Sequence, residues 1–564
     1  MKPNSGSERR LLGLMIGFHQ CVVLVGGGLL IIGWTRIFNV SSKAHFEQAL
    51  LLLAAISILA IGLSIVWRQQ PFEHVRLRIL AGLWLGMCAY FFLLGLWNNA
   101  YLTQVAQTHI ATDIFRNAFR TFQSPWYGVA RPIEGFEVVA LVVALSAFAA
   151  VLDWVYRARE LNGWRLGALF ALLHLLLIAM VGWVLGSFAE ATDAVYRGFA
   201  EHGNQDHFAS LLAVWRDWNT TLPMIQGRAN HYPPGLVFLW FVEQRSGFSG
   251  LGVALNLVAA AMCTPVLIAL SAVVGLDRSA AVTAAALCMV SSALLVYPLS
   301  EFAILTAGLT VGAFGAAGLS LWRHSGWAVI AGLALAIHGL ISFTAAFSGL
   351  LVLFFVLSAF AWRTLSRRRT ITVLTMIGAV VALTWTLVYL VTGFDIAACV
   401  VQSIANNRTT MTSEVAADAT RYVLRASGNL LAYGAYLPVL TGLFAMAGTV
   451  VAVSRQRAGG GDKRIAVAAC AVGLTLLAAT FSGLFFLETE RIWVFFTPPL
   501  ALVAGFGAAQ LCPAPNGREI RLIMLVLAAA VSASAVILSI TQDTPPIELI
   551  DAADWQRARD LLRQ

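Results

Sequence analysis

Apolar runs of about 20 residues recur along the chain, and they constrain its fold more than any other feature. Each run is long enough to cross the hydrocarbon core of a bilayer, which is about 30 Å thick. Backbone polar groups at that depth are satisfied only in helices or closed barrels, and apolar runs without alternation indicate helices. Only 12% of the residues are charged, against roughly 25% in a soluble domain. The sequence therefore predicts an all-α polytopic membrane protein.

We expect about fifteen transmembrane helices. Their ranges are 11–34, 47–67, 79–97, 138–155, 166–188, 251–274, 279–297, 303–322, 326–341, 345–362, 371–392, 430–453, 465–486, 493–511 and 522–540. The apolar stretch at 326–362 is interrupted by His338-Gly339 and by Ser342-Phe-Thr344. A histidine near mid-span is costly to bury unpaired. It is either functional or bonded to a neighbouring helix.

Basic residues gather in alternate short loops, and this pattern sets the orientation. It places the N-terminus in the cytoplasm and the longer loops at 98–137, 189–250 and 393–429 outside, with the tail from 541. The expected location is the plasma membrane. The net charge of +9 is explained by this orientation and by affinity for membrane lipids, so it does not indicate nucleic-acid binding.

Two acids follow the fifth predicted span, at the start of the loop 189–250. Glu190 and Asp193 are three residues apart, so they share a face if the helix continues. A carboxylate at the outer membrane edge is well placed as a general base for a hydroxyl acceptor. A solvated acid beside the membrane is an equal alternative. Tyr196 and Arg197 would orient such a carboxylate or anchor the chain at the interface, and Tyr196 is also a candidate contact for the substrate.

The same loop re-enters the membrane at His231-Tyr232-Pro233-Pro234-Gly235. Proline starts a helix well because its missing N–H would be unpaired there. We therefore expect a short interfacial helix at 236–248 that closes at Gly247. His231 and Tyr232 would lie at its mouth, as contacts for a phosphate or as structural loop residues.

Three further charged residues lie in predicted outer segments. Arg491 could hold a phosphate through two hydrogen bonds, or pair with Glu488 or Glu490. Glu301 follows Pro298-Leu-Ser at the start of a span and places a carboxylate on the same outer face, as a candidate substrate contact or a solvated loop residue. Arg408 belongs to a basic cluster suited to an anionic head group, although a solvated loop residue is as plausible.

Motifs of soluble nucleotide-binding domains are absent. There is no Walker A loop, Rossmann fingerprint, HExxH or CxxC pair. The sequence indicates no cofactor, and although a divalent metal is possible in principle, no ligand spacing argues for one. Any activated donor must therefore be reached from the membrane.

The order of these features resembles the GT-C superfamily of membrane glycosyltransferases. The similarity is greatest to the branch of the aminoarabinose transferases, protein O-mannosyltransferases and Rgt-type enzymes. The matching segments, in chain order, are Asp193 to Tyr196, His231 to Gly235, Gly247-Phe248, Pro298 to Glu301, Arg323-His324, Gly332 to Leu335 and Arg491 to Pro498. Two departures stand out: Thr192-Asp193 replaces the paired Asp-Glu, and His-Tyr replaces lysine before Pro-Pro.

The resemblance implies inverting transfer of a sugar from a polyprenyl-phosphate donor to an extracytoplasmic acceptor. Asp193 or Glu190 would take the acceptor proton, and Arg491 would stabilise the departing lipid phosphate with His231 or Arg408. It also divides the chain. Residues 1–160 would be added N-terminal helices, 161–515 a GT-C-like core, and 516–564 the last helix and a short outer tail.

The main alternative is a transporter or lipid flippase without transferase activity. Such a protein needs polar residues within its spans and helices broken at mid-membrane. The predicted spans are nearly free of charge, which favours the enzyme. A catalytically silent scaffold is a third interpretation. The sugar, the acceptor and the oligomeric state are not encoded in these patterns.

Overall fold

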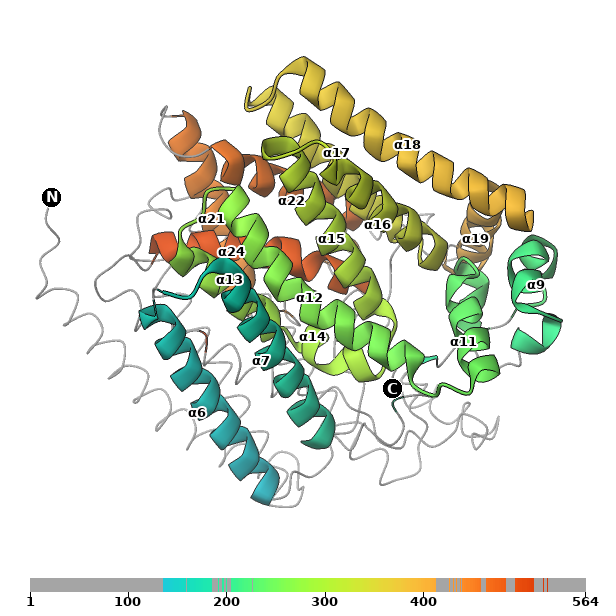
Figure 1. The fold of residues 1–564 in the computed structure, drawn as a ribbon, viewed down its shortest axis with the longest axis horizontal. Helices are drawn as coiled ribbons and strands as arrows, with labels where there is room; N and C mark the ends of the chain where they lie inside the picture. The colour runs from blue at the N-terminus through green and yellow to red at the C-terminus, as the bar shows by residue number, and fades with distance from the viewer. Residues whose placement is uncertain are drawn as a thin grey trace, which may run out of the picture.

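The computed structural model describes residues 135–158, 160–184, 204–225, 227–411, 439–457, 463–482 and 492–511, with isolated positions between and beyond these ranges. Every regular element within them is helical (Figure 1). The long helices are α6 (Gly135–Arg157), α7 (Gly163–Val184), α12 (Leu251–Val273), α13 (Arg278–Met289), α15 (Ala303–Trp322), α16 (Trp327–Ile341), α17 (Ala345–Ala361), α18 (Arg367–Thr392), α19 (Ile396–Met411), α21 (Val439–Arg457), α22 (Lys463–Thr480) and α24 (Thr497–Leu511). The all-α prediction is confirmed for this part of the chain.

Each predicted span that falls within these ranges overlaps one of the helices. The span at 279–297 is divided, because α13 and α14 (Ser292–Val296) belong to a pair bent by 64°. Six described helices are long and apolar enough to cross a membrane, or seven if the bent pair counts as one span. The predicted spans 11–34, 47–67, 79–97 and 522–540 lie outside the described residues, apart from Leu525. The total of about fifteen stays a prediction.

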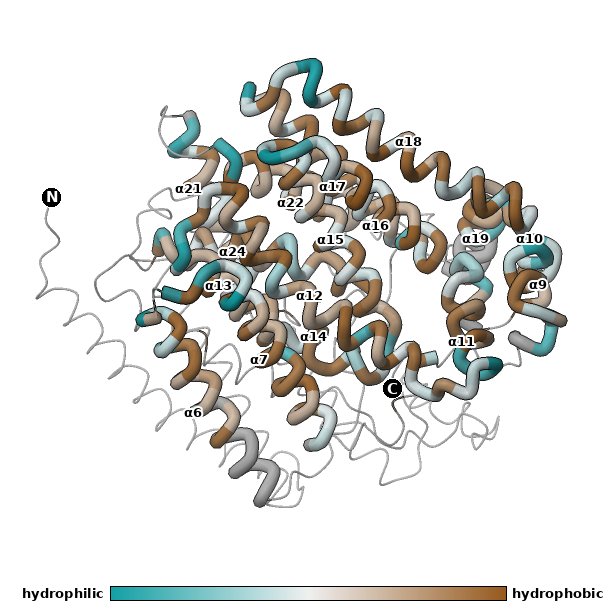
Figure 2. Tube along the Cα trace, in the orientation of Figure 1, coloured by the Kyte–Doolittle hydropathy of each residue, from teal (hydrophilic) through white to brown (hydrophobic). Residues whose placement is uncertain are grey.

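Helix α18 shows why the molecule belongs in a membrane. It is strongly apolar, yet only 11% of its most apolar window is buried inside the protein. Figure 1 shows it along one outer edge of the bundle, and Figure 2 shows apolar residues along its length with hydrophilic ones at its first turns. An apolar face of this size is stable only against lipid or another apolar surface.

Close backbone contact holds the centre of the bundle together. Helix α24 packs between α21 and α13. A Cβ atom on Gly507 would overlap the carbonyl oxygen of Phe444 in α21, and one on Gly505 would lie 2.5 Å from the Cβ of Ala284 in α13. Helices in membranes gain packing energy from such small residues, because lipid supplies little hydrophobic driving force between helices.

Three arginines from the predicted inner loops cap the ends of spans. Arg278 donates to carbonyls of the α6–α7 turn at 2.5 and 2.6 Å. Arg369 donates to a carbonyl in the last turn of α15 at 3.1 Å, and Arg464 donates to the last residue of α12 at 2.9 Å. Cations at helix C-termini satisfy orphan carbonyls and complement the helix dipole. The segments predicted to share the inner side thus contact one another at one end of the bundle.

Candidate functional site

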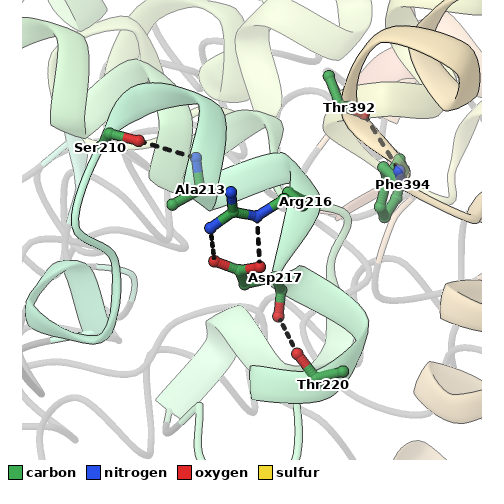
Figure 3. Close-up of polar contacts among 7 residues, drawn as sticks. All are labelled: Ser210, Ala213, Arg216, Asp217, Thr220, Thr392 and Phe394. Atoms are coloured by element: carbon green, nitrogen blue, oxygen red, sulfur yellow. Dashed lines mark hydrogen bonds and ion pairs between the residues drawn. The ribbon is translucent and has the colours of Figure 1, made fainter.

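Between residues 204 and 231, the described part of the loop 189–250 contains four short helices. These are η3 (Asn204–His207), α9 (Leu211–Arg216), α10 (Trp218–Thr221) and η4 (Gly227–His231). Ser210 caps α9 by accepting from the Ala213 amide at 3.2 Å (Figure 3). In the same view, Arg216 donates twice to Asp217, at 2.8 and 2.9 Å. Since this pair is exposed, it orders the turn and contributes little stability.

The predicted short helix after Pro233-Pro234 is confirmed as α11 (Gly235–Ser246). Pro234 is its N-cap, and Gly247 ends it at a φ of 67°, a left-handed conformation that favours glycine. A Cβ atom on Gly235 would overlap the carbonyl oxygen of Leu340, at the end of α16. The His-Tyr-Pro-Pro segment is therefore fixed directly against the break between α16 and α17.

A buried carboxylate, Glu243, ties three parts of the loop together. It accepts hydrogen bonds from the Tyr196 hydroxyl at 2.7 Å, from the Gly252 amide at 3.0 Å and from the Gly250 amide. Its side chain is 4% exposed, so losing any of these bonds leaves an unpaired polar group. The role of Glu243 is not evident from the motifs, although it is the only acid in an otherwise mostly apolar twelve-residue segment.

Tyr196 is buried beside this carboxylate. Its ring lies 4.6 Å from that of Trp240 and 4.8 Å from that of Phe302. Burial, followed by the bond to Glu243, raises the pKa of the Tyr196 phenol well above its usual range. The Tyr196 hydroxyl is thus hydrogen-bonded to Glu243, and the Tyr196 ring packs against the ring of Phe302. A direct contact of Tyr196 with substrate stays a prediction.

A cleft lies where three of the sequence motifs meet. It is lined by Phe199, Tyr232, Leu236, Glu301, Phe302, Ala303, Thr306, Ile341, Ser342, Thr344 and Ile492. Tyr232 comes from the His-Tyr-Pro-Pro segment, Glu301 ends Pro-Leu-Ser-Glu, and Ile492 follows Arg491. These positions are far apart in sequence. The fold brings them to one cavity, whose volume is about 30 Å³.

Asn256 on α12 positions the turn that carries Glu301. Its amide donates to the backbone carbonyls of Pro298 at 3.3 Å and of Glu301 at 2.9 Å. Asn256 is fully buried, and its two bonds add to the turn's own bond from the Glu301 amide to the Tyr297 carbonyl at 2.8 Å. The side chain therefore holds the Glu301 backbone at the edge of the cleft. An asparagine within an otherwise apolar span is the sequence signal that points to this role.

The break between α16 and α17 supplies a second polar wall. His338 in the last turn of α16 is fully buried, and its Nε2 lies 2.9 Å from Oγ1 of Thr344. The hydroxyls of Ser342 and Thr344 are also 2.9 Å apart. His338 therefore bonds within its own helix–helix connection, and two hydroxyl side chains from that connection line the cleft.

His231 ends η4, one residue before Tyr232. It is half-buried, and its Nδ1 has no hydrogen-bond partner within the described chain. Burial lowers the pKa of the His231 imidazole, so the ring is neutral near pH 7. A neutral imidazole donates or accepts a hydrogen bond but does not supply a positive charge.

The remaining predicted site residues cannot be placed at atomic detail. Glu190, Asp193 and Arg491 lie outside the described residues, as do Glu488 and Glu490. Arg408 lies on α19, and its side chain is outside the described set. No group of three or more His, Cys, Asp or Glu residues that could hold a metal ion occurs within the described ranges.

No protein-family model matches the sequence, and no curated protein matches it. A solved structure of the archaeal oligosaccharyltransferase AglB from Archaeoglobus fulgidus, in complex with an inhibitory peptide and a dolichol-phosphate, is similar to this chain with a TM-score of 0.39 and 15% sequence identity. The match covers 68% of this chain, which spans 58% of the AglB chain. A likeness of this extent does not identify a family, so function has to be argued from the cleft.

Proposed function

We propose that the chain is a membrane glycosyltransferase of the GT-C type, which moves a sugar from a polyprenyl-phosphate donor to an extracytoplasmic acceptor. One observation carries the proposal. Tyr232, Glu301 and Ile492 line one cleft, and each belongs to a different motif of the resemblance. Helical packing alone gives no reason for these three segments to meet at a cavity with polar walls.

The proposed reaction is a single displacement at the anomeric carbon of the sugar. Asp193, or else Glu190, removes the proton from the acceptor hydroxyl as its oxygen attacks. The bond between the anomeric carbon and the phosphate oxygen breaks, and the lipid phosphate leaves with the electron pair. The carboxylic acid then returns its proton to water.

The departing phosphate needs compensating positive charge. Preorganised donors aimed at a developing anion are often the largest catalytic contribution. Because the pKa of His231 is lowered by burial, we assign it a hydrogen-bonding contact with the phosphate. Charge compensation would then fall to Arg491, with Arg408 as a second cation. Arg491 comes directly before Ile492, which lines the cleft.

The test is a transfer assay with the purified full chain in lipid nanodiscs. Decaprenyl-phosphate glucose, mannose, galactose and arabinose serve as donors, and detergent-solubilised envelope glycans and lipids serve as the acceptor mixture. We expect release of decaprenyl phosphate from at least one donor together with labelling of an acceptor. Asp193→Asn should abolish the release, and Glu190→Gln is the alternative variant if it does not.

Asp206→Asn is the matched control, because Asp206 is an exposed acid of the same loop and should retain full turnover. Turnover by both Asp193→Asn and Glu190→Gln at the wild-type rate would overturn the assignment of the base. In a parallel assay with sealed proteoliposomes, movement of a donor across the bilayer without release of decaprenyl phosphate would instead identify a flippase.

A further inference from the structure

The connection between α16 and α17 contains a hydrogen-bonded group that the proposed reaction does not yet use. We call His338, Ser342 and Thr344 the hinge trio. All three are buried, with exposed fractions of 0%, 3% and 5%. Ser342 and Thr344 line the cleft, while His338 lies behind them and bonds Thr344 through Nε2.

The protonation of His338 determines what the hinge trio offers to the cleft. Nδ1 has no partner among the described residues, whereas Nε2 faces the Thr344 hydroxyl at 2.9 Å. A buried N–H without an acceptor is costly, so the neutral ring carries its hydrogen on Nε2 and donates to Thr344.

With that tautomer, one hydroxyl hydrogen of the hinge trio remains unused. The trio has three internal hydrogen bonds: His338 to Thr344, one between the two hydroxyls, and the Thr344 amide to Ser342 Oγ at 3.3 Å. Its donors are one imidazole N–H, two O–H groups and one amide N–H. The remaining O–H is available to donate into the cleft. If the hydrogen were on Nδ1 instead, both hydroxyl hydrogens would be used in bonds within the trio, and none would remain to donate into the cleft.

Other residues that line the cleft supply acceptors and aromatic rings. Glu301 supplies a carboxylate, and Thr306 donates its own hydrogen to the Ala303 carbonyl at 2.6 Å, which leaves its oxygen as an acceptor. Phe199, Tyr232 and Phe302 supply apolar ring surface. Donors and acceptors that converge beside aromatic rings fit hydroxyl groups on a ring with apolar C–H faces.

We propose that the hinge trio and Glu301 bind hydroxyl groups of the transferred sugar, with His338 as the positioning residue that fixes the direction of the Thr344 hydroxyl. This inference rests on the proposed glycosyltransferase function and names the part of the donor that the cleft binds. The cavity volume of about 30 Å³ holds about two water molecules. It therefore accepts two hydroxyl groups at a ring edge, while the rest of the sugar lies toward the mouth of the cleft.

The experiment measures binding of decaprenyl phosphate and of its glucosyl, mannosyl, galactosyl and arabinosyl derivatives to the full chain in nanodiscs. The sugar increment is the Kd of the bare lipid phosphate divided by the Kd of the tightest glycosylated form. We expect a wild-type increment of about 25-fold, since two neutral hydrogen bonds to the sugar contribute roughly fivefold each. Since a neutral hydrogen bond contributes modestly, Thr344→Val and Ser342→Ala should each reduce it roughly fivefold, with the Kd of decaprenyl phosphate unchanged.

His338 requires a readout that separates positioning from packing. His338→Gln keeps an N–H donor close to the position of Nε2 and should retain most of the increment. His338→Leu removes that donor and should lose the increment to the same extent as Thr344→Val. The matched control is Thr475→Val on α22, which removes a buried hydroxyl that bonds its own helix at 2.8 Å and should change neither Kd.

The outcomes separate a failure of the sugar-binding cleft from a failure of the proposed glycosyltransferase function. Equal binding of glycosylated and bare decaprenyl phosphate by the wild type overturns the sugar-binding cleft and leaves the lipid-phosphate site standing. An unchanged increment in Thr344→Val, Ser342→Ala and His338→Leu overturns the role of the hinge trio. Failure of the wild type to bind any of the five lipids overturns the proposed function, and this inference with it.

Discussion

Replacement of Tyr196 by phenylalanine tests the anchor that closes the candidate site loop. The change removes one hydroxyl and keeps the ring, so the contacts with Trp240 and Phe302 are preserved. What is lost is the 2.7 Å hydrogen bond to the buried carboxylate of Glu243. A hydrogen bond to a charged group contributes about 1.5–3 kcal/mol. Glu243 is 4% exposed, so bulk solvent has little access to replace this bond.

This loss should appear as local opening of the chain around Gly250 and Gly252, whose amides donate to the same carboxylate. A cost of about 1.5–3 kcal/mol raises the opening equilibrium about 10-fold to 150-fold. Hydrogen–deuterium exchange of peptides that cover residues 243–253 measures this directly, provided that reclosing is faster than exchange. Peptides from α13 and α24 should be unaffected.

The matched control is Tyr389→Phe, since Tyr389 is 53% exposed on α18 and its side chain makes no hydrogen bond or ring contact with the described residues. Its exchange pattern should match the wild type. Unchanged exchange at residues 243–253 in Tyr196→Phe would refute the anchor, because the two glycine amides would then be protected independently of the tyrosine.

Three further outcomes follow from the packing and the charges. Gly507→Ala should destabilise the bundle by about 1–3 kcal/mol, seen as a lower thermal midpoint in detergent, because its methyl group would overlap a carbonyl of α21. Gly235→Ala should destabilise the protein by a similar amount. It should also raise the Kd for decaprenyl-phosphate sugars, because α11 must move away from the α16–α17 break. Gly473→Ala, with open space around it, is the control for both variants and should be neutral within about 1 kcal/mol. Burial lowers the pKa of His231 in the fold, so stability is complete above the ordinary value of 6.5 and falls as the pH drops below it. The midpoint of His231→Gln should therefore fall less than that of the wild type between pH 7.5 and pH 5.5, and an equal fall would contradict the burial of this ring.

The sequence by itself determined the class of fold and the positions of the helices. Apolar runs of about 20 residues have one stable arrangement in a bilayer, so α12 and α15 were predictable to within a residue or two. The short helix α11 was equally predictable, because both of its ends are set by nearby residues. Pro234 starts it and Gly247 ends it through backbone preferences that act without the rest of the chain.

Only the tertiary structure decided which polar residues meet. The sequence does not reveal the role of Glu243, because its partners come from 47 residues upstream and from a following turn, and no periodicity encodes such contacts. The sequence allows either a functional or a structural role for His338, and the fold assigns its Nε2 to Thr344 at the edge of the cleft. Local preferences and burial of apolar surface set the helices. The site depends on how those helices cross, which is fixed by side-chain packing between residues far apart in the chain.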